Sequence, residues 1–251
     1  MLSKNKIKYI RSLELKKKRK EEQVFVAEGH KLVGDLLGHF PCKLLIATSN
    51  WLKMNHSATA NEIIEVTQEE LSRASLQKTP QEVLAVFVQP SYDLNPEVIK
   101  SSLCLALDDV QDPGNLGTII RLADWFGIEH IFCSTGTADV YNPKTVQATM
   151  GALARVKVHY CSLPQLIESL TDIPVYGTFL NGNIIYTESL SAHGLIVMGN
   201  EGKGVSLEVE KLINNKLYIP NYPQERETSE SLNVAIATAV ACSEVRRRLL
   251  P

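Results

Sequence analysis

Long hydrophobic runs are missing from this sequence. No stretch approaches the roughly 20 consecutive apolar residues that a membrane-spanning helix needs, and residues 1–20 lack the apolar core of a signal peptide. Glycine and proline are also sparse, with 14 and 11 residues among 251, which excludes collagen-like and low-complexity chains. The sequence therefore predicts a soluble globular protein that is located in the cytoplasm and has no membrane partner.

Cysteine is scarce and scattered. The five cysteines form no CxxC pair, so they predict neither a zinc site nor a thiol redox centre of that type. The six histidines show no paired ligand spacing. We therefore expect reduced, mostly buried thiols and no metal.

Positive charge is concentrated at one end of a chain whose formal net charge is only -2. Residues 1–20 contain nine Lys and Arg against the single acidic residue Glu14, a local charge of +8. Such a cluster suits a polyanion, because each neutralised phosphate releases condensed counterions. We expect nucleic acid as the partner, although a solvated helix face would carry the same charges.

The chain divides into two regions in which short apolar runs typical of strands alternate with helical patterns. In the second region the expected strands are 103–107, 130–133, 156–160, 175–180, 195–199 and 216–220. Because these runs are apolar on both faces and separated by helices, they predict an α/β fold with a mostly parallel sheet covered by helices. A stretch without periodicity separates the regions. We predict a small α/β domain over 1–90, a linker over 91–101 and a larger domain over 102–251.

Three polar segments follow apolar strands of the second region. They are LDDVQDPGNLGTIIRLADWFG (107–127), LIVMGNEGKGVS (195–206) and LYIPNYPQERETSESLNVAIATAV (217–240). Ligands of parallel sheets bind at the carboxyl ends of the strands, so we expect the segments to share one pocket. The glycines of the second segment permit close approach of backbone to a ligand, but the pattern is neither a P-loop nor a dinucleotide fingerprint.

Each polar residue in these segments also has an ordinary structural explanation. Ser231 or Asn233 begins the last helix, and Asn115 and Ser231 suit helix N-caps. Arg121 suits a surface or ion-paired position, and the glycines around Glu201 suit a tight turn. Asn115 and Arg121 are six residues apart, about 600° along a helix, so they share a face only if Asn115 lies in the cap.

Together, DPGNLGTIIRLADWFG, IVMGNEGKG, and IP followed by SLNVAIA closely resemble the signature motifs of the SpoU (TrmH-like) family of RNA ribose 2′-O-methyltransferases, in the family's order. Residues 16–37 are similar to the family's small RNA-substrate-binding domain, which has a ribosomal-protein-L30-like fold. The resemblance implies a SPOUT-type catalytic domain with a C-terminal trefoil knot, although knots are almost absent from proteins. It also implies S-adenosyl-L-methionine as cofactor and a homodimer whose paired catalytic domains complete the active site.

The resemblance also implies roles for individual residues. The positions that match the family's cofactor contacts are Gly199, Ile219 and Leu232. The positions that match its polar catalytic residues are Asn115, Arg121, Glu201, Ser231 and Asn233. One departure is the loop 220–230, which is longer than the family's usual stretch and lacks glycine. Leu232 keeps its expected place if the extra residues bulge outward.

Ribose methylation requires a weakly acidic hydroxyl to lose its proton. Because a guanidinium stays protonated, we expect Arg121 to stabilise the developing alkoxide rather than to abstract the proton. The acceptor hydroxyl is absent from DNA, so the substrate is RNA. The resemblance implies rRNA of the 23S type, because an additional N-terminal RNA-binding domain is more typical of the family's rRNA enzymes than of its single-domain tRNA enzymes. Ribose methylation of tRNA is an alternative, as is a non-catalytic RNA-binding or ribosome-assembly factor.

Overall fold

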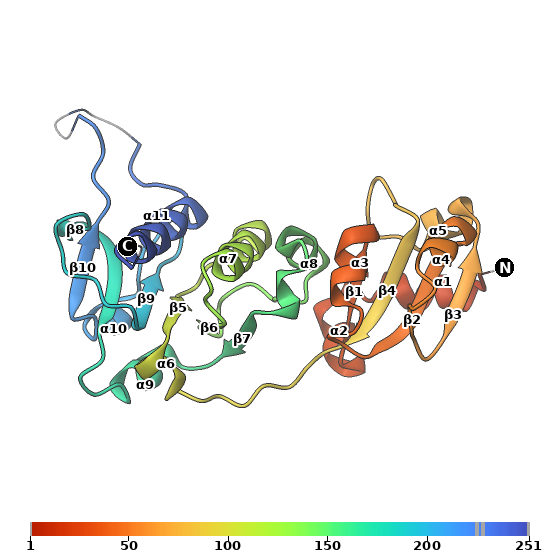
Figure 1. Cartoon of the computed structure of the whole chain (residues 1–251), viewed down its shortest axis with the longest axis horizontal. Coiled ribbons are helices and arrows are strands. Elements are labelled where there is room, and N and C mark those ends of the chain that lie inside the picture. Colours follow the sequence, from red (N-terminus) through yellow and green to blue (C-terminus); the bar gives the residue numbers. More distant parts are fainter. Residues whose placement is uncertain (1, 224–225, 227–228, 250–251) are drawn as a thin grey trace. The chain divides into compact units, whose positions relative to one another are not determined.

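The computed structural model describes residues 2–223, 226 and 229–249. The chain forms two compact units (Figure 1): unit 1 comprises Met1–Ser91 and Asp139–Ala154, and unit 2 comprises Tyr92–Ala138 and Arg155–Pro251. The segment Asp139–Ala154 falls within the predicted domain 102–251 but packs in unit 1. Among the described residues, no helix combines the length and apolar character that a membrane span requires.

Unit 1 is built on a four-stranded mixed sheet with the strand order β1-β4-β2-β3. Strand β4 is antiparallel to both β1 and β2, and β3 is parallel to β2. Its strands are β1 (Val24–Glu28), β2 (Cys42–Thr48), β3 (Ile63–Val66) and β4 (Val83–Val88). Its helices are α1 (Lys4–Ser12), α2 (Lys16–Glu22), α3 (His30–Leu36), α4 (Ser49–Met54), α5 (Gln68–Ala74), α8 (Pro143–Thr149) and the 3₁₀ turn η1 (Ala152–Ala154).

The basic N-terminal segment forms part of the core of unit 1. Ile10 and Leu13 are fully buried in the hydrophobic cluster that covers one face of the sheet. Arg19 is also buried, and its guanidinium donates to the carbonyl oxygens of Leu13 and Glu14 and to the carboxylate of Asp139 at 2.6 Å. One of the nine cations expected to face a polyanion is therefore an internal ion-pair partner, because its fork of donors satisfies backbone carbonyls that burial has removed from water.

The other face of the unit 1 sheet explains why residues 139–154 belong there. The rings of Phe25 and Tyr141 stack with centroids 5.1 Å apart, and Phe25 also contacts the rings of Phe40 and Phe87. Aromatic contacts of this kind supply apolar burial that a small sheet cannot obtain from its own strands alone.

Unit 2 contains a six-stranded sheet with the order β10-β8-β9-β5-β6-β7, in which every neighbouring pair is parallel. Its strands are β5 (Leu103–Leu107), β6 (His130–Cys133), β7 (Lys157–Tyr160), β8 (Val175–Ile184), β9 (Gly194–Met198) and β10 (Asn215–Tyr218). Its helices are α6 (Val98–Ser101), α7 (Pro113–Trp125), α9 (Leu163–Glu168), α10 (Leu207–Glu210) and α11 (Val234–Arg247). The predicted α/β class and parallel sheet are confirmed.

Helices cover both faces of this sheet (Figure 1). The long helices α7 and α11 pack against each other on one face, while α6, α9 and α10 lie over the other. Strands β5 and β9, at the centre, are buried at every position. Alternate residues of a strand point to opposite faces, so Cys104 and Ala106 enter the core beneath α6, α9 and α10. This arrangement brings the carboxyl ends of β5, β9 and β10 to one edge, where the three polar segments begin.

Candidate active site

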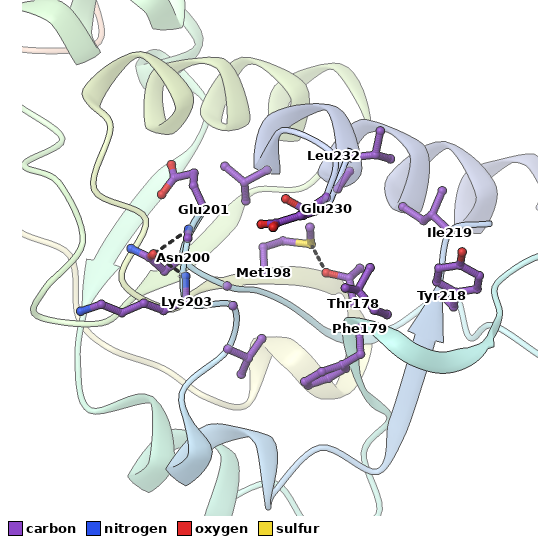
Figure 2. Close-up of a pocket in the computed structure, with 18 of the residues that line it drawn as sticks. Thr178, Phe179, Met198, Asn200, Glu201, Lys203, Tyr218, Ile219, Glu230 and Leu232 are labelled. Carbon is purple, nitrogen blue, oxygen red and sulfur yellow. Dashed lines mark hydrogen bonds between the residues drawn. The ribbon is translucent and has the colours of Figure 1, made fainter. Parts of the chain in front are cut away.

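A pocket of about 480 Å³ lies at the carboxyl ends of the central strands of unit 2 (Figure 2). Its volume is in the range of small-molecule sites. Four stretches of chain and the side chain of Glu210 line it. The stretches are residues 178–180, 198–205, 217–219 and 230–237, the last through Glu230, Ser231, Leu232, Val234 and Ala237. Gly199, Ile219 and Leu232, the three residues expected to contact a cofactor, all lie on its wall.

The glycine-containing loop that follows β9 is held by the side chain of Asn200. Its amide oxygen accepts hydrogen bonds from the backbone N–H groups of Gly202 at 2.9 Å and Lys203 at 3.0 Å. Its amide nitrogen donates to the carbonyl oxygen of Asp109 at 2.7 Å. The carboxylate of the buried Asp108 accepts from the N–H of Ser206 at 2.8 Å. The turn after β5 thus fixes both ends of this loop.

Gly199 is required at the start of the loop by close backbone packing. A Cβ atom at this position would lie 2.3 Å from both the carbonyl carbon of Gly204 and the nitrogen of Val205. The loop closes on itself through two 2.9 Å backbone hydrogen bonds between Asn200 and Gly204. The glycine therefore allows the chain to fold back on the end of β9 and form one wall of the pocket.

The first polar segment starts helix α7, and Asp112 is its N-cap. The Asp112 carboxylate accepts from the N–H of Asn115 at 2.8 Å, and Pro113 occupies the first helical turn, where its missing N–H costs no hydrogen bond. The structural alternative in which Asn115 is the N-cap is therefore wrong. Asn115 and Arg121 are expected to share a face only if Asn115 is the cap. Because Asn115 lies within the helix, the two residues do not share a face.

Three of the five expected catalytic residues form one hydrogen-bonded chain. The amide nitrogen of Asn115 donates to the Glu201 carboxylate at 2.9 Å, and the amide nitrogen of Asn233 donates to the Asn115 amide oxygen at 3.1 Å. These residues come from the three separate polar segments. Glu201 also lines the pocket, so the chain of hydrogen bonds stands at its edge.

Asn233, and not Ser231, is the N-cap of α11. Its amide oxygen accepts from the N–H groups of Ala235 at 3.0 Å and Ile236 at 3.3 Å. The expectation of a Ser231 cap is wrong because the helix begins three residues later, at Val234. Ser231 is exposed and lines the pocket, which leaves its hydroxyl available to a ligand.

Arg121 stands outside this network. It is exposed on α7 and does not line the pocket. Within the described part of the chain its guanidinium has no hydrogen-bond or ion-pair partner, so the ion-paired alternative is not supported. The loop 220–230 is described only in part, because residues 224–225 and 227–228 lie outside the described residues; Arg226, at its tip, is exposed.

The pocket has features that sequence reasoning missed. Thr178, Phe179 and Leu180 line it from β8, which extends beyond the predicted end of that strand. Lys216 lies 4.9 Å from the centroid of the Phe179 ring and pairs with Glu210. The sequence could have indicated the β8 residues through the place of this strand in the predicted sheet, because neighbouring strands of a parallel sheet end at the same edge. For Asn200 the signal was an asparagine between glycines, which favours a side-chain-to-backbone turn.

Comparison with known proteins gives the family. A model described as the SpoU rRNA Methylase family matches residues 102–243. The 23S rRNA (guanosine(2553)-2′-O)-methyltransferase RlmP of Bacillus subtilis is 31% identical over 245 residues, which cover 96% of each chain. This chain belongs to the SpoU rRNA methylase family. A second model, described as an MRM3-like substrate binding domain, matches residues 4–85.

Solved structures of similar proteins agree with this SpoU assignment over the whole chain. A protein of Porphyromonas gingivalis, assigned to the TrmH family of RNA methyltransferases, is 45% identical with a TM-score of 0.89, and the match covers 99% of each chain. The AdoMet-bound rRNA methyltransferase from Sinorhizobium meliloti is 32% identical with a TM-score of 0.86, covering 100% of this chain and 97% of that one. The predicted family is confirmed, as is the predicted enzyme class, an S-adenosylmethionine-dependent RNA ribose 2′-O-methyltransferase.

Proposed function

We propose that this SpoU protein methylates a ribose 2′-hydroxyl of 23S-type rRNA with S-adenosyl-L-methionine as methyl donor. The observation that carries the proposal is the Asn233–Asn115–Glu201 chain of hydrogen bonds, which joins three distant segments at the edge of a pocket of cofactor size. A protein that only binds RNA has no chemical need for this arrangement. The relative RlmP acts on 23S rRNA, which favours rRNA over tRNA.

The pocket suits the cofactor in shape and in lining. Gly199 lets the backbone of the loop after β9 form one wall, and Ile219 and Leu232 supply apolar surface on the others. Backbone N–H and C=O groups near Gly199 and Ile219 offer hydrogen bonds to a polar ligand. S-adenosylmethionine supplies a methyl group already activated by a sulfonium.

Arg121 is the catalytic cation in this proposal. Its exposed guanidinium has no partner in the described structure, so an incoming RNA does not have to displace one. A guanidinium presents fixed donors that match the charge of a phosphate or an alkoxide, and it stays protonated. Arg121 would therefore stabilise negative charge on the ribose oxygen as its proton leaves.

The remaining polar residues position the reacting groups. Asn115 donates to the carboxylate of Glu201 and is itself held by Asn233, and Glu201 in turn sets the edge of the glycine loop. Ser231, which lines the pocket and has no partner among the described residues, would orient the ribose or the cofactor by a hydrogen bond. These are supporting roles that depend on distances between loops, and a shift of about 1 Å would weaken them strongly.

Four further properties belong to this proposal. We propose the C-terminal trefoil knot, supported by the way the segments before α10 and α11 meet α7 through Asn115, and the L30-like fold of unit 1, supported by the substrate-binding family model. We also propose a homodimer. Leu232 and Ile236 leave apolar surface at the start of α11 about half exposed, at 49% and 54%, which a partner copy would cover. A solution mass near 28 kDa by light scattering would contradict the dimer. Because bacterial rRNA is made and assembled in the cytoplasm, the proposed location is the cytoplasm.

The decisive experiment removes the guanidinium. Arg121→Ala should lower methyl transfer to a 23S rRNA transcript by about 100-fold or more, the usual cost of losing a charge-stabilising donor. Its affinity for S-adenosylmethionine should stay within twofold, because Arg121 does not line the pocket. Arg73→Ala, at an exposed position of α5 in unit 1, is the matched control and should keep full turnover. Near-normal turnover of Arg121→Ala would remove the assigned role.

A second measurement identifies the substrate. Ribose-methylation mapping of total RNA from cells with and without the gene should show one 23S rRNA position that loses its methyl group. A position in tRNA would favour the alternative substrate. No changed position, together with no binding of S-adenosylmethionine, would favour a non-catalytic assembly factor.

A further inference from the structure

Glu230 brings an unpaired negative charge to the pocket. It precedes Ser231 and Leu232 and lies over the cavity in Figure 2. In the described part of the chain, three carboxylates line the pocket: those of Glu201, Glu210 and Glu230. Glu201 accepts a hydrogen bond from Asn115, and Glu210 pairs with Lys216. Glu230 has no hydrogen bond or ion pair within the described residues.

The surroundings of Glu230 leave its charge uncompensated by the protein. Met198, Leu217 and Ile219 make much of the neighbouring wall apolar. Lys203 is a cation on the pocket rim, but its side chain extends away from Glu230 (Figure 2). A carboxylate in such a setting interacts more strongly with a cationic ligand than one that is already paired.

The cofactor and the product of the proposed reaction differ in charge at one atom. S-adenosylmethionine carries a sulfonium, and loss of its methyl group to the ribose oxygen leaves the neutral thioether of S-adenosylhomocysteine, while the ribose proton goes to solvent. The amino and carboxyl groups are the same in both molecules. A pocket carboxylate therefore attracts the sulfonium of the cofactor, whereas the neutral thioether of the product offers no such charge.

We propose that Glu230 is a specificity-determining residue that favours the cationic cofactor over the neutral product. This inference rests on the proposed function, because it concerns the same pocket. The carboxylate acts before and after the chemical step: it raises cofactor occupancy and aids product release. It does not stabilise the transition state, in which the positive charge on sulfur is already diminishing.

The expected size of the effect follows from the exposure of Glu230. An ion pair at a largely solvated site contributes about two- to fivefold in affinity, and screening by salt reduces it further. Glu230→Gln keeps the shape of the side chain and removes the charge. We expect it to weaken binding of S-adenosylmethionine by about threefold to fivefold at low salt, and to leave binding of S-adenosylhomocysteine unchanged.

The test is isothermal titration of three ligands into the full-length protein, at low and at high ionic strength. The ligands are S-adenosylmethionine, S-adenosylhomocysteine and sinefungin, which bears an ammonium in place of the methylated sulfonium. Glu230→Gln should lose affinity for the two cationic ligands only, and the loss should shrink at high salt. Glu208→Gln, on α10 and outside the pocket lining, is the matched control and should bind all three as the wild type does.

The outcomes separate this inference from the function itself. Equal weakening of all three ligands by Glu230→Gln would show a structural role and overturn the charge preference, and so would unchanged affinities. A fall in kcat at saturating cofactor, with an unchanged KM for it, would also overturn the inference. If the wild-type protein binds none of the ligands, the proposed function fails before the role of Glu230 is tested.

Discussion

Replacement of Gly199 by alanine tests whether close packing of the glycine loop forms the cofactor pocket. The added Cβ would lie 2.3 Å from the carbonyl carbon of Gly204 and from the nitrogen of Val205, and 2.6 Å from the carbonyl oxygen of Gly204. Ordinary contacts of a Cβ begin near 3.4 Å, so the loop must open by about 1 Å. All three obstructing atoms belong to the backbone, which cannot rotate away as a side chain can.

The cost of this movement sets the expected change in affinity. Overpacking of a close contact costs about 1–3 kcal/mol, which corresponds to roughly 5- to 150-fold in a dissociation constant. Opening the loop also strains the two hydrogen bonds between Asn200 and Gly204, both 2.9 Å long. Because these bonds shape the pocket wall after β9 ends, we expect the loss to appear in cofactor binding more than in the stability of the sheet.

Gly202→Ala supplies the matched control in the same loop. A Cβ at Gly202 meets only the side-chain oxygen of Asn200, at 3.7 Å, which is an ordinary contact. Isothermal titration with S-adenosylmethionine should show at least about fivefold weaker binding for Gly199→Ala and a change of less than about twofold for Gly202→Ala. Urea unfolding should show similar midpoints. Equal affinities for the two variants would refute the role of close packing at Gly199.

Two other perturbations test the N-terminal unit and the C-terminal helix. Simultaneous replacement of Lys8, Lys16 and Lys20 by glutamine, all exposed and unpaired among the described residues, should weaken rRNA binding and reduce the slope of log K against log salt by about two, whereas Lys211→Gln in unit 2 should leave the slope unchanged. Glu244 is buried, and hydrogen bonds from Arg247 and Arg248 lower its pKa from 4.5 to about 2. Its stabilising contribution is therefore complete above pH 4.5 and disappears as the pH falls toward 2. The difference in urea stability between the wild type and Glu244→Gln should accordingly narrow from pH 7 to pH 3, and a difference independent of pH would contradict the assignment.

The sequence predicts helices and strands correctly wherever a local pattern of residues determines them. The run 103–107 coincides with β5 because a strand buried on both faces leaves an uninterrupted apolar signature. Helix α7 begins at Pro113, since the Asp112 cap and the fixed backbone of Pro113 determine its first turn. Strand β8 continues four residues beyond 180 because its second half pairs with β10 after a register shift. No local pattern reports that pairing.

The sequence could not predict properties that depend on contacts between residues far apart in the chain. In the sequence, Arg19 is one of several cations in a basic run. In the structure it is buried and forms an ion pair with Asp139, which lies 120 residues away in the chain. Deletion of residues 1–20 would thus remove core residues along with surface charge, which is why replacement of exposed lysines is the better perturbation. Glu230 similarly lies in a loop without a recognisable pattern, and its place in the pocket depends on where β10 and α11 bring that loop.

The linked amides explain why asparagine, and not aspartate, stands at positions 115 and 233. Asn233 uses its oxygen to cap α11 and its nitrogen to bind the oxygen of Asn115, whose nitrogen is then free for Glu201. An aspartate at 115 would place a second carboxylate beside Glu201 and lose the donor, and one at 233 would face an acceptor oxygen with no hydrogen. Within this chain of hydrogen bonds, only Glu201 carries a charge, and it stands at the end of the chain that lines the pocket. The start of α11 and the first turn of α7 are thereby joined by neutral amide groups. These groups have no alternative partner in the described structure, so a displacement of one polar segment also displaces the other two.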